Sequence, residues 1–226
     1  MCEFKTDIKK TIIESIKKIC CCDKKLFKSE WEFEYELAIE LRKRLKNEYN
    51  IFIEYCELDL CSNDYKGTIF VDMAIQNKGN NNIYPIQLKY SAYDNTNKCV
   101  GGTNSGGKLI YGFVEDISIV EKNFKIANFK NGYCILLTND HYILKPTKNI
   151  QQNSPYKDFI VSLETKIIKG KRIYRGEDTE LKAKPILEIN EYFVQKNWYT
   201  DCLTGSFKEH AFLLLEIPQH KSEFFI

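Results

Sequence analysis

The N-terminal part of the chain alternates apolar and charged positions at helical spacing. Isoleucines recur every three or four residues between lysines, at Ile8, Ile12, Ile16 and Ile19. Residues that far apart share one face of a helix. The pattern therefore predicts an amphipathic helix over residues 6–21.

A second helix is predicted to begin near Ser29. Ser29 and Glu32 form a capping-box pattern, in which the serine accepts from the first turn and the glutamate reaches back. An apolar stripe follows at helical spacing, formed by Phe33, Leu37, Leu41 and Leu45. The Lys/Arg-rich end of this segment suits the negative pole of a helix dipole.

Beyond residue 50 the chain changes to short segments rich in β-branched and aromatic residues, separated by turn-prone stretches. Three strands are predicted, over residues 51–60, 68–76 and 83–90. The polar stretch 77–82 is predicted to join the second and third strands into a hairpin. Residues 91–107, rich in Gly, Asn and Ser, are expected to form a mobile loop.

Helical spacing returns over residues 108–127, and a buried-type strand is predicted at 133–137. Beyond Pro146 the pattern predicts a basic, strand-like region at 159–187 and a last strand at 211–217. The expected fold class is α/β, with a mixed central sheet flanked by helices and extra C-terminal strands. We expect a single domain, 1–226, with a core at about 29–140, the N-terminal helix 6–21 and a C-terminal elaboration at 146–226.

Composition narrows the class of protein. The net charge of +2 over 226 residues is too small for a protein that coats nucleic acid by charge alone, so any such binding needs local patches. No apolar run reaches the roughly 20 residues that cross a bilayer, and the first residues lack a signal-peptide layout. We therefore expect a soluble, cytoplasmic protein without a membrane partner. The nine cysteines lack the paired spacing of a zinc site and are expected to be reduced.

One carboxylate stands out within an apolar strand segment. Asp72 lies between Val71 and Met73, and the predicted hairpin can bring it beside Gln87. Side chains two apart on a strand share a face, so Gln87 and Lys89 project together. A buried carboxylate is costly unless partnered, and a divalent cation with oxygen ligands would resolve that cost.

This arrangement resembles the PD-(D/E)XK nuclease superfamily, the type II restriction endonuclease-like fold. The match consists of Val71-Asp72, a hairpin-length gap, and then the run Pro85-Ile86-Gln87-Leu88-Lys89-Tyr90. The predicted order of helix, three strands, helix and strand is the common core of that family, and the match covers about residues 29–140. The resemblance implies a restriction-endonuclease-like core and hydrolysis of phosphodiester bonds in DNA.

The resemblance also implies a set of site residues. Asp72 and Gln87 would hold Mg²⁺, with Mn²⁺ expected to substitute, and Lys89 would orient or activate the attacking water. Val71 replaces the proline of the family's motif. Gln87 replaces the usual acidic residue, and an amide coordinates through its carbonyl without bringing charge.

The family often adds a glutamate from the helix before the strands. Glu34 is the candidate, because it follows the inward stripe of the second helix, and Glu30 is the alternative one turn earlier. Both glutamates could instead be solvated helix charges. The expected catalytic set is thus Asp72, Gln87, Lys89 and Glu34, with Asp72, Gln87 and Glu34 as metal ligands.

A basic stretch runs from Lys166 to Lys184. Its lysines and arginines fit a hairpin that grips phosphates, or a solvated surface strand. The candidate nucleic-acid contacts are Lys169, Lys171, Arg172 and Arg175. DNA is the expected partner, with RNA left open, and a homodimer is expected if both strands of a duplex are cut.

Two other functions stay open. The chain could keep the nuclease fold and act only as a nucleic-acid-binding or regulatory module, which Gln87 and the near-neutral charge favour. Residues 102–108 also nearly spell a phosphate-binding loop, but Leu109 stands where Ser or Thr is required. An ATP-using enzyme built on that loop is the third alternative.

Overall fold

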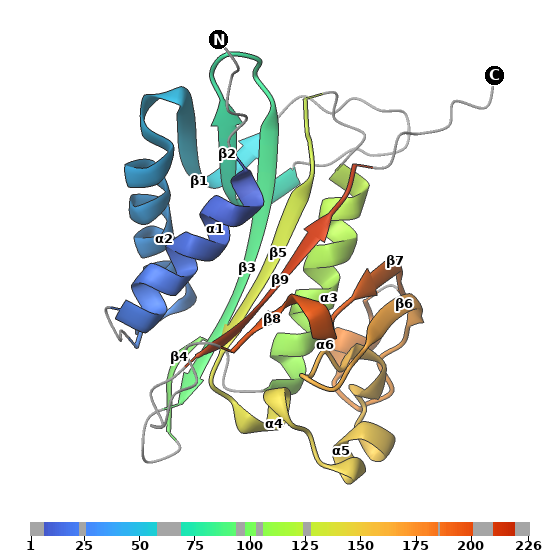
Figure 1. Ribbon diagram of the computed structural model, residues 1–226. Coiled ribbons are helices and arrows are strands. Elements are labelled where there is room, and N and C mark those ends of the chain that lie inside the picture. The colour runs from blue at the N-terminus through green and yellow to red at the C-terminus, as the bar shows by residue number, and fades with distance from the viewer. Residues whose placement is uncertain are drawn as a thin grey trace, which may run out of the picture.

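The computed structural model describes residues 7–22, 26–57, 69–93, 98–102, 106–123, 128–184, 186–200 and 210–219. Two helices come first, four strands follow, and helices and strands are mixed over the rest of the described chain (Figure 1). The helices are α1 (Ile8–Lys17), α2 (Glu30–Leu45), α3 (Gly106–Asn123), α4 (His141–Leu144), α5 (Lys148–Asn153) and α6 (Thr179–Lys182), with helical turns η1 (Lys18–Cys22), η2 (Lys46–Glu48), η3 (Lys157–Phe159) and η4 (Gln195–Asn197). The strands are β1 (Tyr49–Glu57), β2 (Ile69–Asn77), β3 (Ile83–Tyr93), β4 (Cys99–Gly102), β5 (Gly132–Thr138), β6 (Ile167–Arg172), β7 (Leu187–Phe193), β8 (Trp198–Tyr199) and β9 (Ala211–Ile217).

The central sheet is mixed, with the strand order β1-β2-β3-β5-β9-β8. β1, β2 and β3 form an antiparallel meander, and β4 pairs with β3 outside the main order. β3 and β5 are parallel and are connected through α3, whereas β9 pairs antiparallel with β5. β6 and β7 form a second, two-stranded sheet. The predicted α/β class, with a mixed sheet, flanking helices and extra C-terminal strands, is confirmed.

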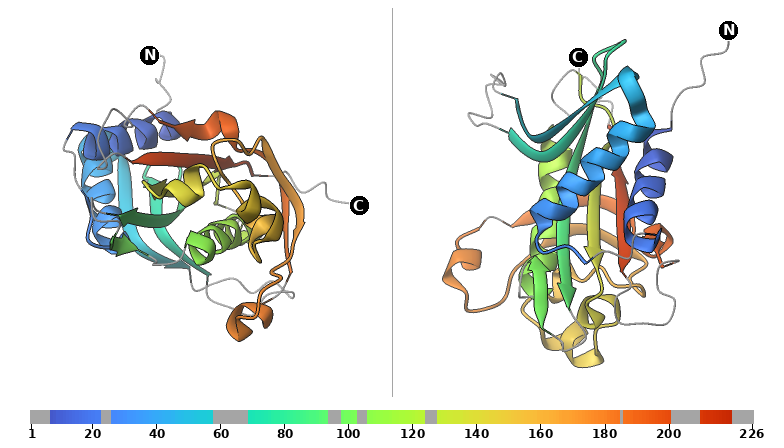
Figure 2. Two further views of the ribbon diagram at one scale, coloured as in Figure 1. Left: turned by 90° about the horizontal axis from the view of Figure 1, so that it is seen from below. Right: turned by 90° about the vertical axis from the view of Figure 1, so that its left-hand side faces the viewer.

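Helices cover both faces of the central sheet (Figures 1 and 2). On β5, Ile135 and Leu137 pack in the apolar cluster with α1 and α2, whereas Cys134 and Leu136 pack in the cluster with α3. Every residue of β5 is buried, which explains its continuous apolar sequence. Full burial of one such side chain contributes about 1.5–3 kcal/mol, so this two-sided packing holds the sheet in place.

The segments predicted as helices are helices in the structure, but they begin and end at other residues than predicted. Ser29 caps α2, because its Oγ accepts from the Glu32 N–H at 3.1 Å. The Glu32 carboxylate returns to the Lys28 N–H at 2.6 Å rather than to the N–H of the capping serine. The expected ends of several elements, at residues 6, 58–60, 68 and 124–127, lie outside the described residues.

The loop predicted at 91–107 is wrong in three places, the last of them at Gly106 and Gly107, where α3 already begins. β3 continues to Tyr93, and Cys99–Gly102 forms β4 on its edge. Gly101 lets β4 approach closely, because a Cβ there would lie 2.4 Å from the Phe27 carbonyl oxygen. Residues 94–97 and 103–105 lie outside the described residues. Among its described residues, the region predicted as strand-like at 159–187 contains the strand β6, the short helix α6 and the first residue of β7.

Among the described residues, no helix combines the length and the apolar character needed to cross a membrane.

Candidate active site

The edge of β3 has a gap between two neighbouring strands. β2 pairs with β3 from Gln76 opposite Ile83 to Met73 opposite Ile86, and β4 takes up pairing at Ser91. Figure 2 shows β1 and β2 curving away from the rest of the sheet beyond this point. The backbone groups of β3 in the gap therefore need other partners, since an unpaired N–H in the interior is costly.

Two carboxylates occupy that gap. Asp72 Oδ2 accepts the Leu88 N–H at 2.6 Å, and Glu30 Oε2 accepts the Tyr90 N–H at 2.8 Å. Strand pairing is thus replaced by acidic side chains from β2 and α2. We call this region the notch and define it by Glu30, Glu34, Glu54, Asp72, Gln87, Lys89 and Asp116.

Gln87 fastens β2 to β3 within the notch. Its Oε1 accepts the Asp72 N–H at 3.2 Å, and its Nε2 donates to the Phe70 carbonyl at 3.2 Å. The hairpin therefore brings Gln87 beside Asp72, as the sequence predicts. The amide oxygen retains a second lone pair that could face a cation.

Lys89 projects from the same face of β3 as Gln87, toward α3, whereas Ile86, Leu88 and Tyr90 face the core on the opposite side. Its Nζ lies 3.0 Å from Asp116 Oδ2 and 3.6 Å from Glu30 Oε1. Burial alone would lower the pKa of Lys89, but the carboxylates of Asp116, Glu30 and Asp72 outweigh it and raise that pKa. Lys89 is therefore a cation at neutral pH.

Both glutamates considered on α2 lie in the notch, so the interpretation as solvated helix charges is wrong. Glu30 bonds to β3, as described above. Glu34 is only 6% exposed, and its Oε1 has no hydrogen-bond partner among the described residues. Burial, with the nearby charge of Asp72, raises the pKa of Glu34 to about 7. The Ser29 cap fixes where α2 begins, and this start places residues 30 and 34 one turn apart beside β3.

The structure adds two carboxylates that the sequence did not indicate. Asp116 on α3 is buried, and this burial raises its pKa well above the usual range despite the Lys89 charge. Glu54 on β1 has a φ of 49° and interrupts the β1–β2 pairing between Ile53 opposite Met73 and Tyr55 opposite Val71. Its backbone N–H bonds to Glu34. A carboxylate next to the apolar stripe of α3 was the one available signal for Asp116.

The donor chemistry of the notch suits a hard divalent cation. Carboxylates outnumber the single lysine, and burial raises the pKa of Glu30 and Asp72 as well as that of Glu34. An oxygen-rich, anionic set with an unpartnered carboxylate oxygen fits the ligand preference of Mg²⁺ and Mn²⁺. As the side chains stand, no three His, Cys, Asp or Glu residues of the described chain already converge on one point. The Glu34 and Asp72 side chains would have to change position to hold a cation together, and Asp72 Oδ2 now accepts the Leu88 N–H.

The basic stretch covers β6 and the connection through α6 that leads to β7, and we call this β6–α6–β7 unit the β6–β7 hairpin. Several of its cations are engaged within the protein: Lys169 pairs with Glu191, Arg175 with Asp158, and Arg172 donates to the Asp158 carbonyl at 2.7 Å. Lys171 is exposed. Lys108, the last residue of the stretch that nearly spells a phosphate-binding loop, lies in α3 and pairs with Asp178 at 2.9 Å.

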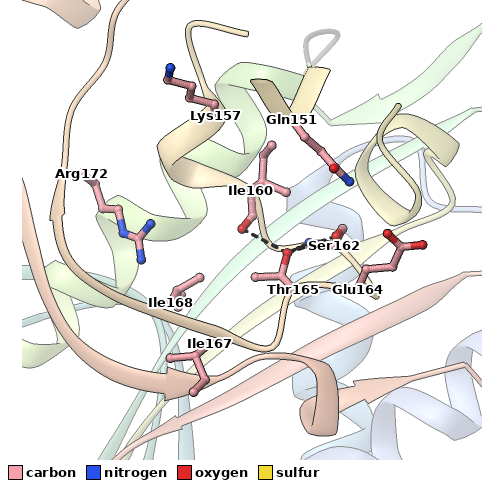
Figure 3. A pocket seen from close by; sticks show the side chains of 9 residues that line it. All are labelled: Gln151, Lys157, Ile160, Ser162, Glu164, Thr165, Ile167, Ile168 and Arg172. Carbon is pink, nitrogen blue, oxygen red and sulfur yellow. Dashed lines mark hydrogen bonds between the residues drawn. The ribbon is translucent and has the colours of Figure 1, made fainter. Parts of the chain in front are cut away.

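Four hollows in the described part of the chain lie along this region and contain no residue of the notch, and two of them border η3 at Lys157. One, of about 380 Å³, is lined by Gln151, Lys157, Ile160, Ser162, Glu164, Thr165, Ile167, Ile168 and Arg172 (Figure 3). The other, of about 410 Å³, contains Arg175 and shares Lys157. Neither contains a residue of the notch. The Ser162 and Thr165 hydroxyls bond to each other at 3.0 Å, so they are already satisfied. We therefore place the candidate chemistry in the notch.

Comparison of the chain with protein-family models, with curated proteins and with solved structures gives no match.

Proposed function

We propose that this protein is a metal-dependent nuclease of the PD-(D/E)XK type, which hydrolyses phosphodiester bonds in DNA with Mg²⁺ or Mn²⁺. The observation that supports the proposal most strongly is the notch itself. Asp72 lies beside Gln87 and Lys89 at a gap in the sheet edge, and two glutamates of α2 reach the same gap. Among the described residues, the main elements follow the order α2, β1, β2, β3, α3, β5, with the helical turn η2 and the short strand β4 between them, and this order agrees with the resemblance.

Asp72 and Glu34 are the proposed anionic metal ligands, and the free lone pair of the Gln87 carbonyl is the neutral one. A bound divalent cation would polarise the phosphate and stabilise charge on the leaving oxygen. Because Glu34 has a raised pKa, it must lose its proton to serve as a ligand, so metal binding should release protons below neutral pH.

Lys89 has an electrostatic role in this proposal. Its raised pKa keeps it protonated, so it cannot accept a proton from water. A fixed ammonium next to the reacting phosphate would instead lower the energy of the hydroxide and of the negative charge that develops on the phosphate oxygens. We assign Lys89 to orientation and stabilisation of the attacking water.

The proposed DNA contacts are the cations of the β6–β7 hairpin, Lys169, Lys171, Arg172 and Arg175, with a homodimer if both strands are cut. RNA stays open as a substrate. To contact phosphates, these side chains must give up their ion pairs within the protein. The loss of these pairs costs little, because exposed ion pairs contribute only about 0–1 kcal/mol each.

A catalytically degenerate nucleic-acid-binding or regulatory module is the second candidate. Gln87 favours it, because both polar atoms of its amide already hold β2 and β3 together. Such a module would bind DNA without dependence on metal.

Incubation of supercoiled plasmid with Mg²⁺, Mn²⁺ or a chelator tests the proposal. We expect cleavage with either metal, none with chelator, and a loss of at least about 100-fold in D72N, since removal of a ligand charge weakens a hard-cation site. Asn keeps an acceptor for the Leu88 N–H, so this variant should fold. E115Q, which removes a carboxylate on α3 that pairs with Lys184 outside the notch, is the matched control. Equal cleavage by D72N and wild type would refute the assignment of the site.

A further inference from the structure

The α3 face toward β3 has an unusual pairing of residues one helical turn apart. Gly112 and Asp116 are spaced i, i+4, so they lie on the same face. A Cβ at Gly112 would lie 3.2 Å from Lys89 Cε and 3.6 Å from Cδ. The glycine therefore leaves the space in which the aliphatic stem of Lys89 crosses the helix.

At the end of that space, Asp116 meets the ammonium. The distance from Lys89 Nζ to Asp116 Oδ2 is 3.0 Å, shorter than the 3.6 Å to Glu30 Oε1. The Asp116 side chain is 9% exposed and that of Glu30 is 35% exposed. Asp116 is thus the nearer and the more deeply buried of the two partners.

A buried ion pair is a poor source of stability, because desolvation of both charges can exceed their attraction. The buried Asp116 carboxylate is therefore better explained by its effect on the lysine than by a contribution to the stability of the fold. The Lys89 Nζ also donates to the Leu88 carbonyl at 2.9 Å, so its ammonium is held from two sides. The result is a cation fixed beside Asp72.

We propose that Asp116, with Gly112 providing the room, is the positioning residue that holds the Lys89 ammonium in the notch. Asp116 does not touch the substrate in this arrangement and acts only through Lys89. We call the contact between Asp116 and the Lys89 ammonium the tether. The consequence of the tether for catalysis depends on the proposed nuclease function, whereas the tether itself does not.

The tether is tested directly by the ¹H–¹⁵N spectrum of lysine ammonium groups in ¹⁵N-labelled protein, with the Lys89 signal assigned by its loss in K89M. A held ammonium exchanges slowly with water and gives a visible signal. We expect this signal in wild type and in E115Q, and its loss in D116N. A wild-type protein without the signal, or a D116N protein that retains it, would contradict the proposal.

G112A gives an independent test that keeps both charges. Its methyl group presses on the lysine stem, so the Lys89 signal should shift or broaden while the helical content is retained. This variant also decides the case if D116N does not fold. An unchanged Lys89 signal in G112A would mean that the stem does not lie against α3.

The catalytic consequence is measured separately. In a protein that cleaves DNA, D116N should lower kcat by about 10–100-fold with little change in KM, a magnitude typical of residues that support a site from behind. E115Q should match wild type. The two proposals can fail separately. If the wild-type protein cleaves no DNA, but D116N loses the Lys89 signal that the wild type shows, the nuclease function is refuted and the ion pair between Asp116 and Lys89 is retained. Equal kcat in D116N and wild type would refute the positioning role.

Discussion

Among the glutamates of α2, Glu34 is the one whose ionised form is most strongly disfavoured by its surroundings. Its side chain is buried, one oxygen has no partner, and Asp72 and Glu54 are close enough for their charges to disfavour its ionisation. A group whose pKa is higher in the folded than in the unfolded state stabilises the fold only at low pH. The ionised form therefore destabilises the metal-free protein at neutral and alkaline pH.

The variant E34Q should remove that cost. With a pKa of about 7 in the folded state and 4.5 as the ordinary value, stability from Glu34 is complete below pH 4.5 and is lost as the pH rises through 7. We expect E34Q to be more stable than wild type by about 1–3 kcal/mol at pH 8, a range reduced for partial solvent screening, and to show no such gain at pH 4.

Urea unfolding of the metal-free proteins at the two pH values measures this. E36Q, on a less buried part of the same helix, is the control and should show no comparable pH-dependent gain. An E34Q gain that is equal at pH 4 and pH 8 would mean that ionisation of Glu34 is not the cause.

The sequence could predict the main site residues to different degrees. A strand period of two was enough to place Gln87 and Lys89 on one face, and the hairpin placed Asp72 next to them. Helical spacing brought Glu30 and Glu34 to the sheet without deciding which one bonds to β3. Asp116 could not be predicted, because its role depends on which face of α3 meets Lys89, and that is set by tertiary packing.

The β2–β3 pair is held in the notch by a side chain instead of a backbone ladder. Because Nε2 of Gln87 donates to the Phe70 carbonyl, Q87E replaces a donor with a second acceptor. We expect Q87E to destabilise the metal-free protein by about 1–3 kcal/mol, the usual effect of leaving a buried group unsatisfied. Added Mn²⁺ should raise the Tm of Q87E more than that of wild type, since a second anionic ligand strengthens cation binding.

Thermal unfolding with and without Mn²⁺ measures both effects. Q76E, on the same β2–β3 hairpin outside the notch, is the control for an added charge. If Mn²⁺ stabilises Q87E less than wild type, Gln87 is not a metal ligand.

The β6–β7 hairpin gives a prediction about DNA binding. Each phosphate contact contributes a slope of about −0.9 to log K against log salt on duplex DNA. Neutralising Lys169, Lys171 and Arg172 together should flatten that slope by about two to three, equally for different DNA sequences, because phosphate contacts do not read bases. Fluorescence anisotropy on one labelled duplex measures this, with neutralisation of Lys43, Lys46 and Lys78 as the control. An unchanged slope would mean that these three side chains are solvated and do not contact DNA.

Elements with a strong local period were predictable, and those that depend on distant partners were not. The apolar sequence of β5 and β9 was enough to predict both as strands. The strand predicted at 211–217 is confirmed at both its first and its last residue. β4 was missed because a stretch with two glycines carries little strand signal, and pairing with β3 decides its conformation. α6 interrupts the C-terminal strands for a reason visible at Asp178, whose side chain caps it.

His210 couples the stability of the entire fold to pH. It is 1% exposed, neither ring nitrogen has a hydrogen-bond partner in the part of the chain that the structure describes, and burial lowers its pKa to about 4. Between pH 6.5 and 4 the unfolded chain binds the proton and the folded protein does not, so stability falls as the pH falls. The wild-type loss from this group is about 3 kcal/mol over that range.

The variant H210F should lack this loss. Glu34 works in the opposite sense over part of the same range, so the comparison is the stability of H210F minus that of wild type at each pH. We expect this difference to increase by about 3 kcal/mol from pH 7 to pH 4, and H141F, at an exposed position, to show no such change. A difference that stays constant with pH would mean that His210 does not titrate on unfolding.

Crystals soaked in Mn²⁺ give the most direct view of the proposed chemistry. We expect an anomalous peak in the notch, within bonding distance of Asp72 and Glu34 and next to the Gln87 carbonyl, and no such peak in crystals of D72N. Mn²⁺ at other sites with an empty notch, in crystals of a protein that cleaves DNA, would contradict the assignment of Asp72 and Glu34 as the metal ligands.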